Sequence, residues 1–165
     1  MPLAAISAYS VSVFLHVTAV VVGFGATFAE AIIFPVAMRL DARHLPYVHG
    51  LQLAINRRLA TPALVVVLAT GVFQVADGNW DFGDPWISAS FVILIVLGGL
   101  LGGYLGPADR RLGAMAEREI AAAGPGPVRL SEEYLRRAQM EARVGALAGL
   151  LVVVAIFLMV TKPGA

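Results

Sequence analysis

Four apolar stretches, each long enough to cross a bilayer, constrain the fold of this chain more than any other feature. They lie at residues 10–38, 59–77, 86–106 and 142–161. A helix needs about 20 residues to cross a hydrocarbon core of about 30 Å, and none of these stretches alternates with the two-residue period of a barrel strand. Of the 165 residues, 59% are hydrophobic and 14% are charged, which is far from the balance of a soluble domain. The sequence therefore predicts an all-α, polytopic membrane protein with four transmembrane helices in a bundle.

Three of these helices are expected to continue beyond the bilayer. Residues 107–123 and 130–143 are rich in Ala, Glu and Arg, which are strong helix formers. Ser131, followed by two glutamates, has the pattern of a helix N-cap. A single four-helix domain is therefore expected over residues 1–165, with helices at about 10–38, 46–77, 86–122 and 131–161.

Arginines are concentrated in two of the three connections, and this sets the expected orientation. They flank the first connection and populate the third, whereas residues 77–86 between the second and third helices carry three Asp and neither Lys nor Arg. Cytoplasmic loops carry an excess of Lys and Arg. Both termini are therefore expected outside, with helices two, three and four extended on the cytoplasmic side. Trp80 and Trp86 suit the aromatic belt at the outer interface.

Composition and spacing exclude several functional classes. A net charge of +1 without a basic stripe argues against nucleic acid as a partner, and the absence of Cys excludes disulfides, iron–sulfur clusters and thiolate zinc sites. His44 and His49 are five residues apart and so do not form the i, i+4 pair that chelates zinc. A calcium loop starting at Asp77 fails because Phe82 stands where glycine is needed. We therefore predict no metal site, and no motif supports an enzyme.

Glycines spaced four apart indicate close helix packing. The stretch VLGGLLGGYLG at residues 96–106 contains several small-xxx-small pairs, and similar residues recur on helices one and four. The expected packing residues are Gly23, Gly98, Gly99, Gly102, Gly103, Gly106, Gly145 and Gly149. Both packing within one bundle and contact in a homo-oligomer or larger membrane complex fit this pattern.

The first helix is expected to carry its few polar side chains on one face. At 100° per residue, His16, Gly23, Thr27 and Glu30 fall within about 40° of one line. A face of this kind turns toward protein or a water-filled cavity and not toward lipid. The candidate ligand or proton residues are therefore His16, Thr27 and Glu30.

Two interpretations stay open for each charged or titratable residue on this face. His16 is either an interior histidine that hydrogen-bonds to a neighbouring helix, or a haem ligand or proton carrier. Glu30 is either paired with Arg57 or Arg58, or part of a proton relay. Haem is thus a candidate cofactor, although the sequence does not identify one.

Several short motifs also carry a resemblance to known membrane proteins. FLHVTAVVVGFGATF at residues 14–28, PW at 85–86 and PADRRL at 107–112 resemble a family of uncharacterised bacterial integral membrane proteins. That family is distantly similar to the membrane domain of copper-resistance D proteins and to the J-type bacterial protoporphyrinogen oxidase, which are helical bundles with a histidine on an early helix. His16 carries the likeness. The resemblance implies a multi-pass protein of the bacterial cytoplasmic (inner) membrane.

Three functional hypotheses fit these patterns. The first is a non-catalytic accessory or ligand-binding membrane protein, for which the lipid bilayer is the expected partner. The second is a haem- or porphyrin-binding redox protein that uses His16, and the third is a small proton- or ion-coupled transporter that uses the face of His16 and Glu30. We favour the first, because fold alone does not select a chemistry.

Overall fold

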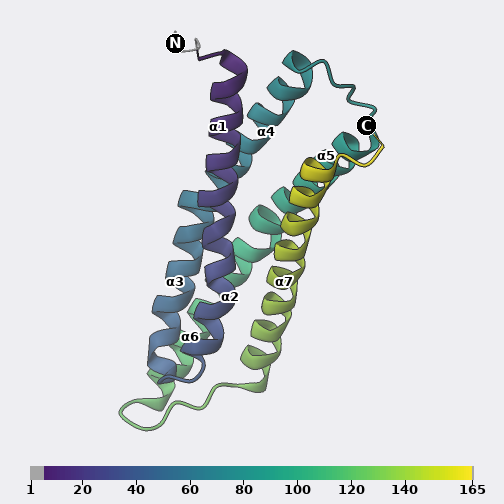
Figure 1. Ribbon diagram of the computed structural model, residues 1–165. Helices are drawn as coiled ribbons and strands as arrows, with labels where there is room; N and C mark the ends of the chain where they lie inside the picture. Colours follow the sequence, from purple (N-terminus) through teal and green to yellow (C-terminus); the bar gives the residue numbers. More distant parts are fainter. Residues whose placement is uncertain (1–5, 165) are drawn as a thin grey trace.

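The computed structural model describes residues 6–164, and its long elements are all helical (Figure 1). Four helical rods of 30, 36, 39 and 30 residues are long and apolar enough to cross a membrane, namely Ala8–Ala37, Ala42–Asp77, Pro85–Ala123 and Glu132–Thr161. The prediction of an all-α protein with four membrane-spanning helices is therefore confirmed.

Three of the four rods are interrupted by a π-helical turn. The first rod consists of α1 (Ala8–Ala19), η1 (Val20–Phe24) and α2 (Gly25–Ala37). The second consists of a short 3₁₀ turn, η2 (Ala42–His44), then α3 (Leu45–Ile55), η3 (Asn56–Ala60) and α4 (Thr61–Asp77). The third consists of α5 (Pro85–Gly98), η4 (Gly99–Leu105) and α6 (Gly106–Ala123), and the fourth is α7 (Glu132–Thr161) alone. A π-helical turn adds about one residue to a turn, so the face of the helix beyond it is rotated by about 100°.

Local side chains explain where the rods begin and end. The Ser131 hydroxyl accepts a hydrogen bond from the N–H of Tyr134 at 3.1 Å, which confirms the predicted N-cap of α7. Pro85 stands in the first turn of α5, where its missing N–H is not needed. Gly124 follows α6 with φ of 58°, a conformation that residues with a Cβ rarely adopt. The chain therefore turns sharply after α6, at residues 124–127 (GPGP).

The rods form an antiparallel bundle in which α1 packs on α4, α3 on α6 and α5 on α7. Both termini lie at one end, here called the terminal end, together with the connection at 78–84 (Figure 1). The connections at 38–44 and 124–131 form the opposite end, here called the Arg-rich end. The two helix pairs α1/α4 and α5/α7 diverge toward the terminal end (Figure 1). A cavity between the pairs is lined by residues of all four helices.

The buried apolar residues form three clusters along the bundle axis. The cluster toward the Arg-rich end includes Leu45, Leu112 and Tyr134, and the central cluster includes Phe24, Leu97 and Val152. The third, toward the terminal end, consists of Val75, Trp86 and Ile87. Each cluster joins side chains from several rods, so the core holds the bundle together along its whole length.

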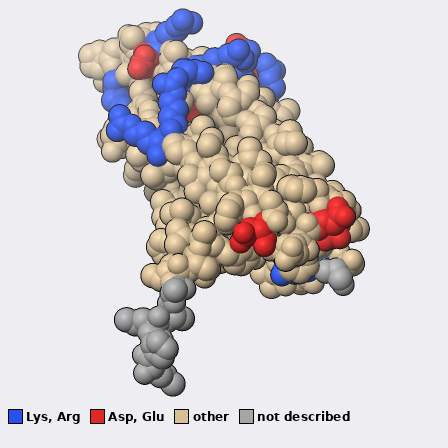
Figure 2. All heavy atoms as spheres, turned by 90° about the horizontal axis from the view of Figure 1, so that it is seen from above, with Lys and Arg blue, Asp and Glu red and all other residues tan. Residues whose placement is uncertain are grey.

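The surface has the charge distribution expected of a membrane protein. Figure 2 shows the Lys and Arg side chains of the visible face gathered mainly at one end, where some acidic side chains also lie, with further acidic side chains at the other end and a broad uncharged band between. Large apolar side chains such as Phe14, Ile95 and Val160 are exposed. Burial of such a band in hydrocarbon removes its apolar surface from water.

Four of the predicted packing glycines lie where a neighbour approaches closely. A Cβ at Gly23 would overlap that of Ala63 on α4, and one at Gly149 would lie 3.3 Å from the Phe28 ring. A Cβ at Gly98 would lie 3.3 Å from Leu64, and one at Gly106 would be in ordinary contact with Nδ2 of Asn56 on the second rod, at 3.6 Å. These glycines permit close contact between rods.

The other four predicted packing glycines have open surroundings. Apart from the backbone of the surrounding turns of the same helix and the two adjacent residues, no heavy atom of the described residues would lie within 4 Å of a Cβ at Gly99, Gly102, Gly103 or Gly145. The first three belong to η4 and are exposed. The prediction assumed a regular helix, whereas the π-helical turn directs these glycines away from the neighbouring rods. Close packing therefore does not require a glycine at these four positions within the bundle, and their role in contacts with another subunit stays a prediction.

Candidate functional site

Two cavities lie inside the bundle. The first, of about 390 Å³, is here called the carboxylate cavity because Glu30, Asp109 and Glu141 line it. The second, of about 580 Å³, is here called the histidine cavity because His16 lines it. Three residues line both cavities and form the wall between them: Phe24, Leu97 and Val152. The predicted site residues are thus divided between two places.

His16 is held in a fixed orientation at the edge of the histidine cavity. Its side chain is 8% exposed, and its Nδ1 lies 2.8 Å from the hydroxyl of Thr70. The Thr70 hydroxyl donates its single hydrogen to the carbonyl of Val66 at 2.6 Å, so it accepts the bond from the Nδ1–H of His16. In a neutral imidazole this arrangement leaves the lone pair on Nε2.

The walls of the histidine cavity are mainly apolar and aromatic. Trp80 and Trp86 line it and meet edge to face, with ring centroids 5.4 Å apart. Lys162, the only lysine of the chain, also lines it, with Nζ 4.2 Å from the centroid of the Trp80 ring. Gly71 leaves the His16 ring uncrowded, because a Cβ there would lie 3.6 Å from Cε1. Apolar walls with few polar groups are typical of small-molecule sites.

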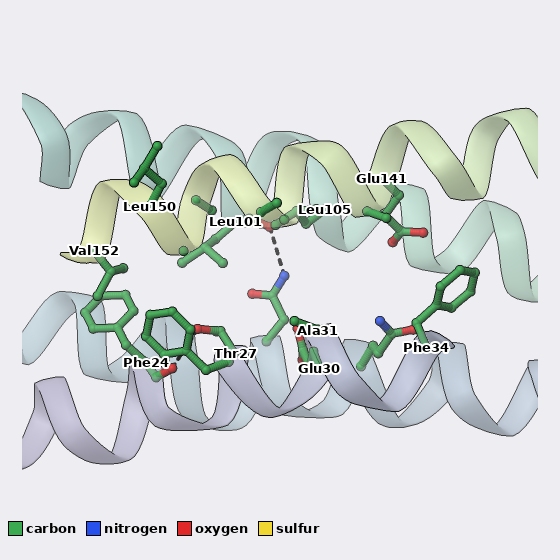
Figure 3. Close-up of a pocket in the computed structure, with 18 of the residues that line it drawn as sticks. Phe24, Thr27, Glu30, Ala31, Phe34, Leu101, Leu105, Glu141, Leu150 and Val152 are labelled. Carbon is green, nitrogen blue, oxygen red and sulfur yellow. Dashed lines mark hydrogen bonds between the residues drawn. The ribbon is translucent and has the colours of Figure 1, made fainter. Parts of the chain in front are cut away.

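The carboxylate cavity brings acidic side chains together from opposite sides. Figure 3 shows Glu141 of α7 pointing into the cavity and Glu30 on the facing helix α2. Oε1 of Glu30 is buried and has no hydrogen-bond partner among the described residues. The predicted ion pair of Glu30 with Arg57 or Arg58 is not formed, because η3 directs its first residue, Asn56, inward and both arginines to the surface.

A histidine and two carboxylates form a buried polar cluster beside this cavity. His49, Asp109 and Glu141 are 1%, 4% and 8% exposed. Nδ1 of His49 lies 3.5 Å from Oδ1 of Asp109, and the potential ligand atoms of all three residues lie within 4.8 Å of one another. The other ring nitrogen, Nε2, lies 2.8 Å from the hydroxyl of the fully buried Tyr134. The His49 ring is therefore held between Tyr134 and the carboxylates.

All three π-helical turns contribute to the carboxylate cavity. Phe24 of η1, Asn56 of η3 and both Leu101 and Leu105 of η4 line it. Nδ2 of Asn56 donates to the carbonyl of Leu101 at 3.0 Å, which is the dashed line in Figure 3. This bond joins two π-helical turns across the bundle. Such turns are frequent at functional sites.

The predicted polar face of the first rod is not a single face in the structure. His16 lines the histidine cavity and Glu30 the carboxylate cavity. The prediction assumed an uninterrupted α-helix, whereas η1 lies between these two residues and rotates the face beyond it. Thr27 lines the carboxylate cavity, but its hydroxyl donates to the carbonyl of Phe24 in its own rod at 2.8 Å.

Sequence reasoning considered His49 only together with His44 and rejected that pair as a zinc site, and it missed Asp109 and Glu141. The sequence pattern that indicates the two carboxylates is a charged residue on the apolar, core-facing side of a helix. Asp109 falls among the buried residues of α6, three residues before Leu112, and Glu141 falls among those of α7, three residues after Ala138. A charged residue that keeps the 3.6-residue period of the core-facing side must point inward.

The four apolar rods and their interior polar sites define a helical, polytopic integral membrane protein. The chain belongs to the family described as "Predicted integral membrane protein (DUF2269)", which matches residues 10–163. The resemblance to a family of predicted integral membrane proteins is thereby confirmed. No curated protein and no solved structure matches the chain. The distant similarity to copper-resistance D proteins and to the oxidase stays a prediction.

Proposed function

We propose that this protein is a non-catalytic, ligand-binding membrane protein whose ligand lies in the histidine cavity. The observation that carries the proposal is the hydrogen bond from Nδ1 of His16 to Thr70, which fixes the ring and leaves Nε2 without a hydrogen-bond partner among the described residues. The cavity volume of about 580 Å³ lies within the range of about 300–1,000 Å³ that is usual for small-molecule sites.

Haem is the ligand that fits these features best. A proximal histidine holds the iron through one ring nitrogen while the other donates a hydrogen bond to an oxygen atom. His16 and Thr70 provide this arrangement, and Trp80 and Trp86 provide aromatic surface for a macrocycle. Lys162 provides a cation for a carboxylate of the ligand. When bound, haem would supply one-electron chemistry at its iron.

The absorption spectrum of the protein, purified in mild detergent after expression with a haem precursor, tests this proposal. We expect a Soret band that the His16→Ala variant loses. His44→Ala is the matched control, because His44 is exposed and lines neither cavity, and it should keep the band. A colourless parent protein would contradict haem as the ligand, and a band retained in His16→Ala would contradict the role of His16.

A coupled transporter has less support than a binding protein. The wall formed by Phe24, Leu97 and Val152 separates the two cavities with apolar side chains. A charged or strongly hydrated solute would have to shed its water to cross this wall. The wall therefore favours two separate binding places over a continuous pathway along the bundle.

We further propose that the protein resides in the bacterial cytoplasmic membrane with its Arg-rich end inside. Support comes from the arginines gathered mainly at one end (Figure 2), whereas the connection at 78–84, at the other end, contains neither Lys nor Arg. The excess of Lys and Arg in cytoplasmic connections sets the orientation of multi-pass proteins. Both termini and the histidine cavity would then lie toward the outer side.

A further inference from the structure

Three buried side chains from three helices form a ligand set that the proposed His16 site does not use. His49 comes from α3, Asp109 from α6 and Glu141 from α7. We propose that these residues bind one divalent transition-metal cation inside the Arg-rich half of the bundle. This metal site is independent of the ligand in the histidine cavity, since the two lie on opposite sides of the wall formed by Phe24, Leu97 and Val152.

The spacing of the ligand atoms suits a metal ion. Metal–nitrogen and metal–oxygen bonds of about 2.1 Å in a tetrahedral site place neighbouring ligand atoms about 3.4 Å apart. Nδ1 of His49 and Oδ1 of Asp109 are 3.5 Å apart, and the whole set lies within 4.8 Å. The Glu141 carboxylate therefore needs only a small movement to complete three ligands around one ion.

Buried atoms without partners point to the same place. Nδ1 of His49, Oδ1 of Asp109 and Oε1 of Glu30 are buried and make no hydrogen bond within the described part of the chain. Buried polar atoms are almost always satisfied, and each exception requires an explanation. A cation bound between His49 and Asp109 would satisfy both of their atoms at once. Glu30 lines the same cavity and could provide a further oxygen ligand.

The charge balance also favours a cation. Three carboxylates line the carboxylate cavity, and within residues 6–164 their one ion-pair partner is His49. Burial of uncompensated negative charge is costly in a protein interior, and more so within a membrane. A buried carboxylate avoids this cost by binding a proton, and a divalent ion would take the place of such protons. Imidazole with carboxylate oxygens suits Zn²⁺, Fe²⁺ or Mn²⁺ better than the oxygen-preferring Mg²⁺ and Ca²⁺ or the sulfur-preferring Cu⁺.

Tyr134 acts as a positioning residue for this site. Its hydroxyl lies 2.8 Å from Nε2 of His49. If Nε2–H donates to the Tyr134 oxygen, the lone pair of the imidazole lies on Nδ1, on the side of Asp109. Histidines that bind metals usually donate their second ring N–H to an oxygen in this way, which fixes the tautomer and orients the ring.

Zinc binding by the purified full-length protein tests the proposal. The protein in detergent is stripped with a chelator, dialysed against limiting Zn²⁺, and analysed for bound zinc and for affinity by competition with a zinc indicator. Zn²⁺ is a suitable probe because divalent sites generally bind it more tightly than Mn²⁺ or Fe²⁺. We expect one zinc per chain, with affinity at least about tenfold weaker in Asp109→Asn and in Glu141→Gln.

Two control variants distinguish zinc binding at this site from binding at surface carboxylates and from binding at the His16 site. Glu117→Gln removes an exposed carboxylate of α6, and His16→Ala removes the ligand of the other cavity. Both should bind zinc like the parent protein, and Asp109→Asn should keep any Soret band. If the parent protein binds no zinc, or if Glu117→Gln loses as much zinc affinity as Asp109→Asn, the proposal is wrong.

A second variant keeps the test decisive if a carboxylate variant does not fold. Tyr134→Phe retains all three ligands and removes only the hydroxyl beside Nε2 of His49. It should weaken zinc binding by about 10-fold to 100-fold, as loss of an outer hydrogen-bond partner does at other sites. Zinc should also raise the midpoint of thermal unfolding of the parent more than that of Tyr134→Phe. Equal affinity and equal shifts in both proteins would overturn the role of Tyr134 in positioning the His49 ring for metal binding.

Discussion

At the scale of single residues, the partners of the ring nitrogens distinguish the three histidines of this chain. His16 donates from Nδ1 to Thr70, and His49 lies between Tyr134 and Asp109. His44 is exposed near the start of the second rod. The three histidines therefore lie in three different surroundings, and only the two buried ones are suited to bind a ligand.

Loss of the Thr70 hydroxyl should weaken ligand binding at His16. In Thr70→Val the Nδ1–H of His16 loses its acceptor, so the ring is no longer held in the tautomer that presents a lone pair at Nε2. We expect haem affinity to fall by about tenfold. Haem titration followed at the Soret band measures this, with Thr70→Ser as the variant that retains the hydroxyl. If Thr70→Val binds as tightly as Thr70→Ser, the hydrogen bond does not position His16.

Removal of the Tyr134 hydroxyl should destabilise the metal-free protein. Tyr134→Phe leaves Nε2 of the buried His49 without a partner, and an unsatisfied buried polar group costs about 1–3 kcal/mol. Denaturant unfolding in detergent should show this loss in the free energy of unfolding. Tyr104→Phe is the control, because Tyr104 is exposed, and it should stay within about 0.5 kcal/mol of the parent. Equal stability of the two variants would mean that the Tyr134 bond contributes little.

At the scale of helices, hydropathy predicts the rods but not the turns within them. A long apolar run forms a helix in lipid whatever its exact period, so the four rods follow directly from the sequence. A π-helical turn changes no residue type, and the sequence pattern therefore carries little sign of it. Its consequence is nevertheless large, since η1 places His16 and Glu30 at different cavities.

The candidate site divides in the same way into predictable and unpredictable parts. His16 and Glu30 were identified because a polar residue in an apolar stretch is conspicuous. Asp109 and Glu141 lie in stretches with several charged residues, whereas His49 lies in the mainly apolar helix α3, and only the packing of α3, α6 and α7 brings the three together. Such contacts between distant segments depend on how the rods rotate and pair, which a single sequence does not specify.

The two kinds of glycine should respond differently to substitution. A side chain at Gly23 meets Ala63 of α4 at once, so Gly23→Val should cost about 1–3 kcal/mol through overpacking. Gly102 has open surroundings, and Gly102→Ala should be neutral or stabilising, because Ala favours a helix by up to about 1 kcal/mol over Gly. Thermal unfolding in detergent compares the two variants. A tolerated Gly23→Val would show that the rods separate easily at this point.

At the scale of the whole molecule, the orientation in the membrane can be tested by labelling. The chain contains no Cys, so a single introduced thiol reports on its own position. Asp81→Cys lies in the connection at the terminal end, and Arg118→Cys lies on α6 toward the Arg-rich end; both positions are exposed. A membrane-impermeant maleimide should label the first variant on intact cells and the second only after lysis. The reverse pattern would contradict the proposed orientation.

The π-helical turns also have a mechanical consequence. Helices often bend at such widened turns. The three turns η1, η3 and η4 all border the carboxylate cavity, through Phe24, Asn56, Leu101 and Leu105. Among the described rods, α7 alone runs from one end of the bundle to the other without a π-helical turn. Three rods can thus bend at a π-helical turn, whereas α7 is uninterrupted. Since α7 lines both cavities, it provides a continuous wall along which the three interrupted rods are arranged.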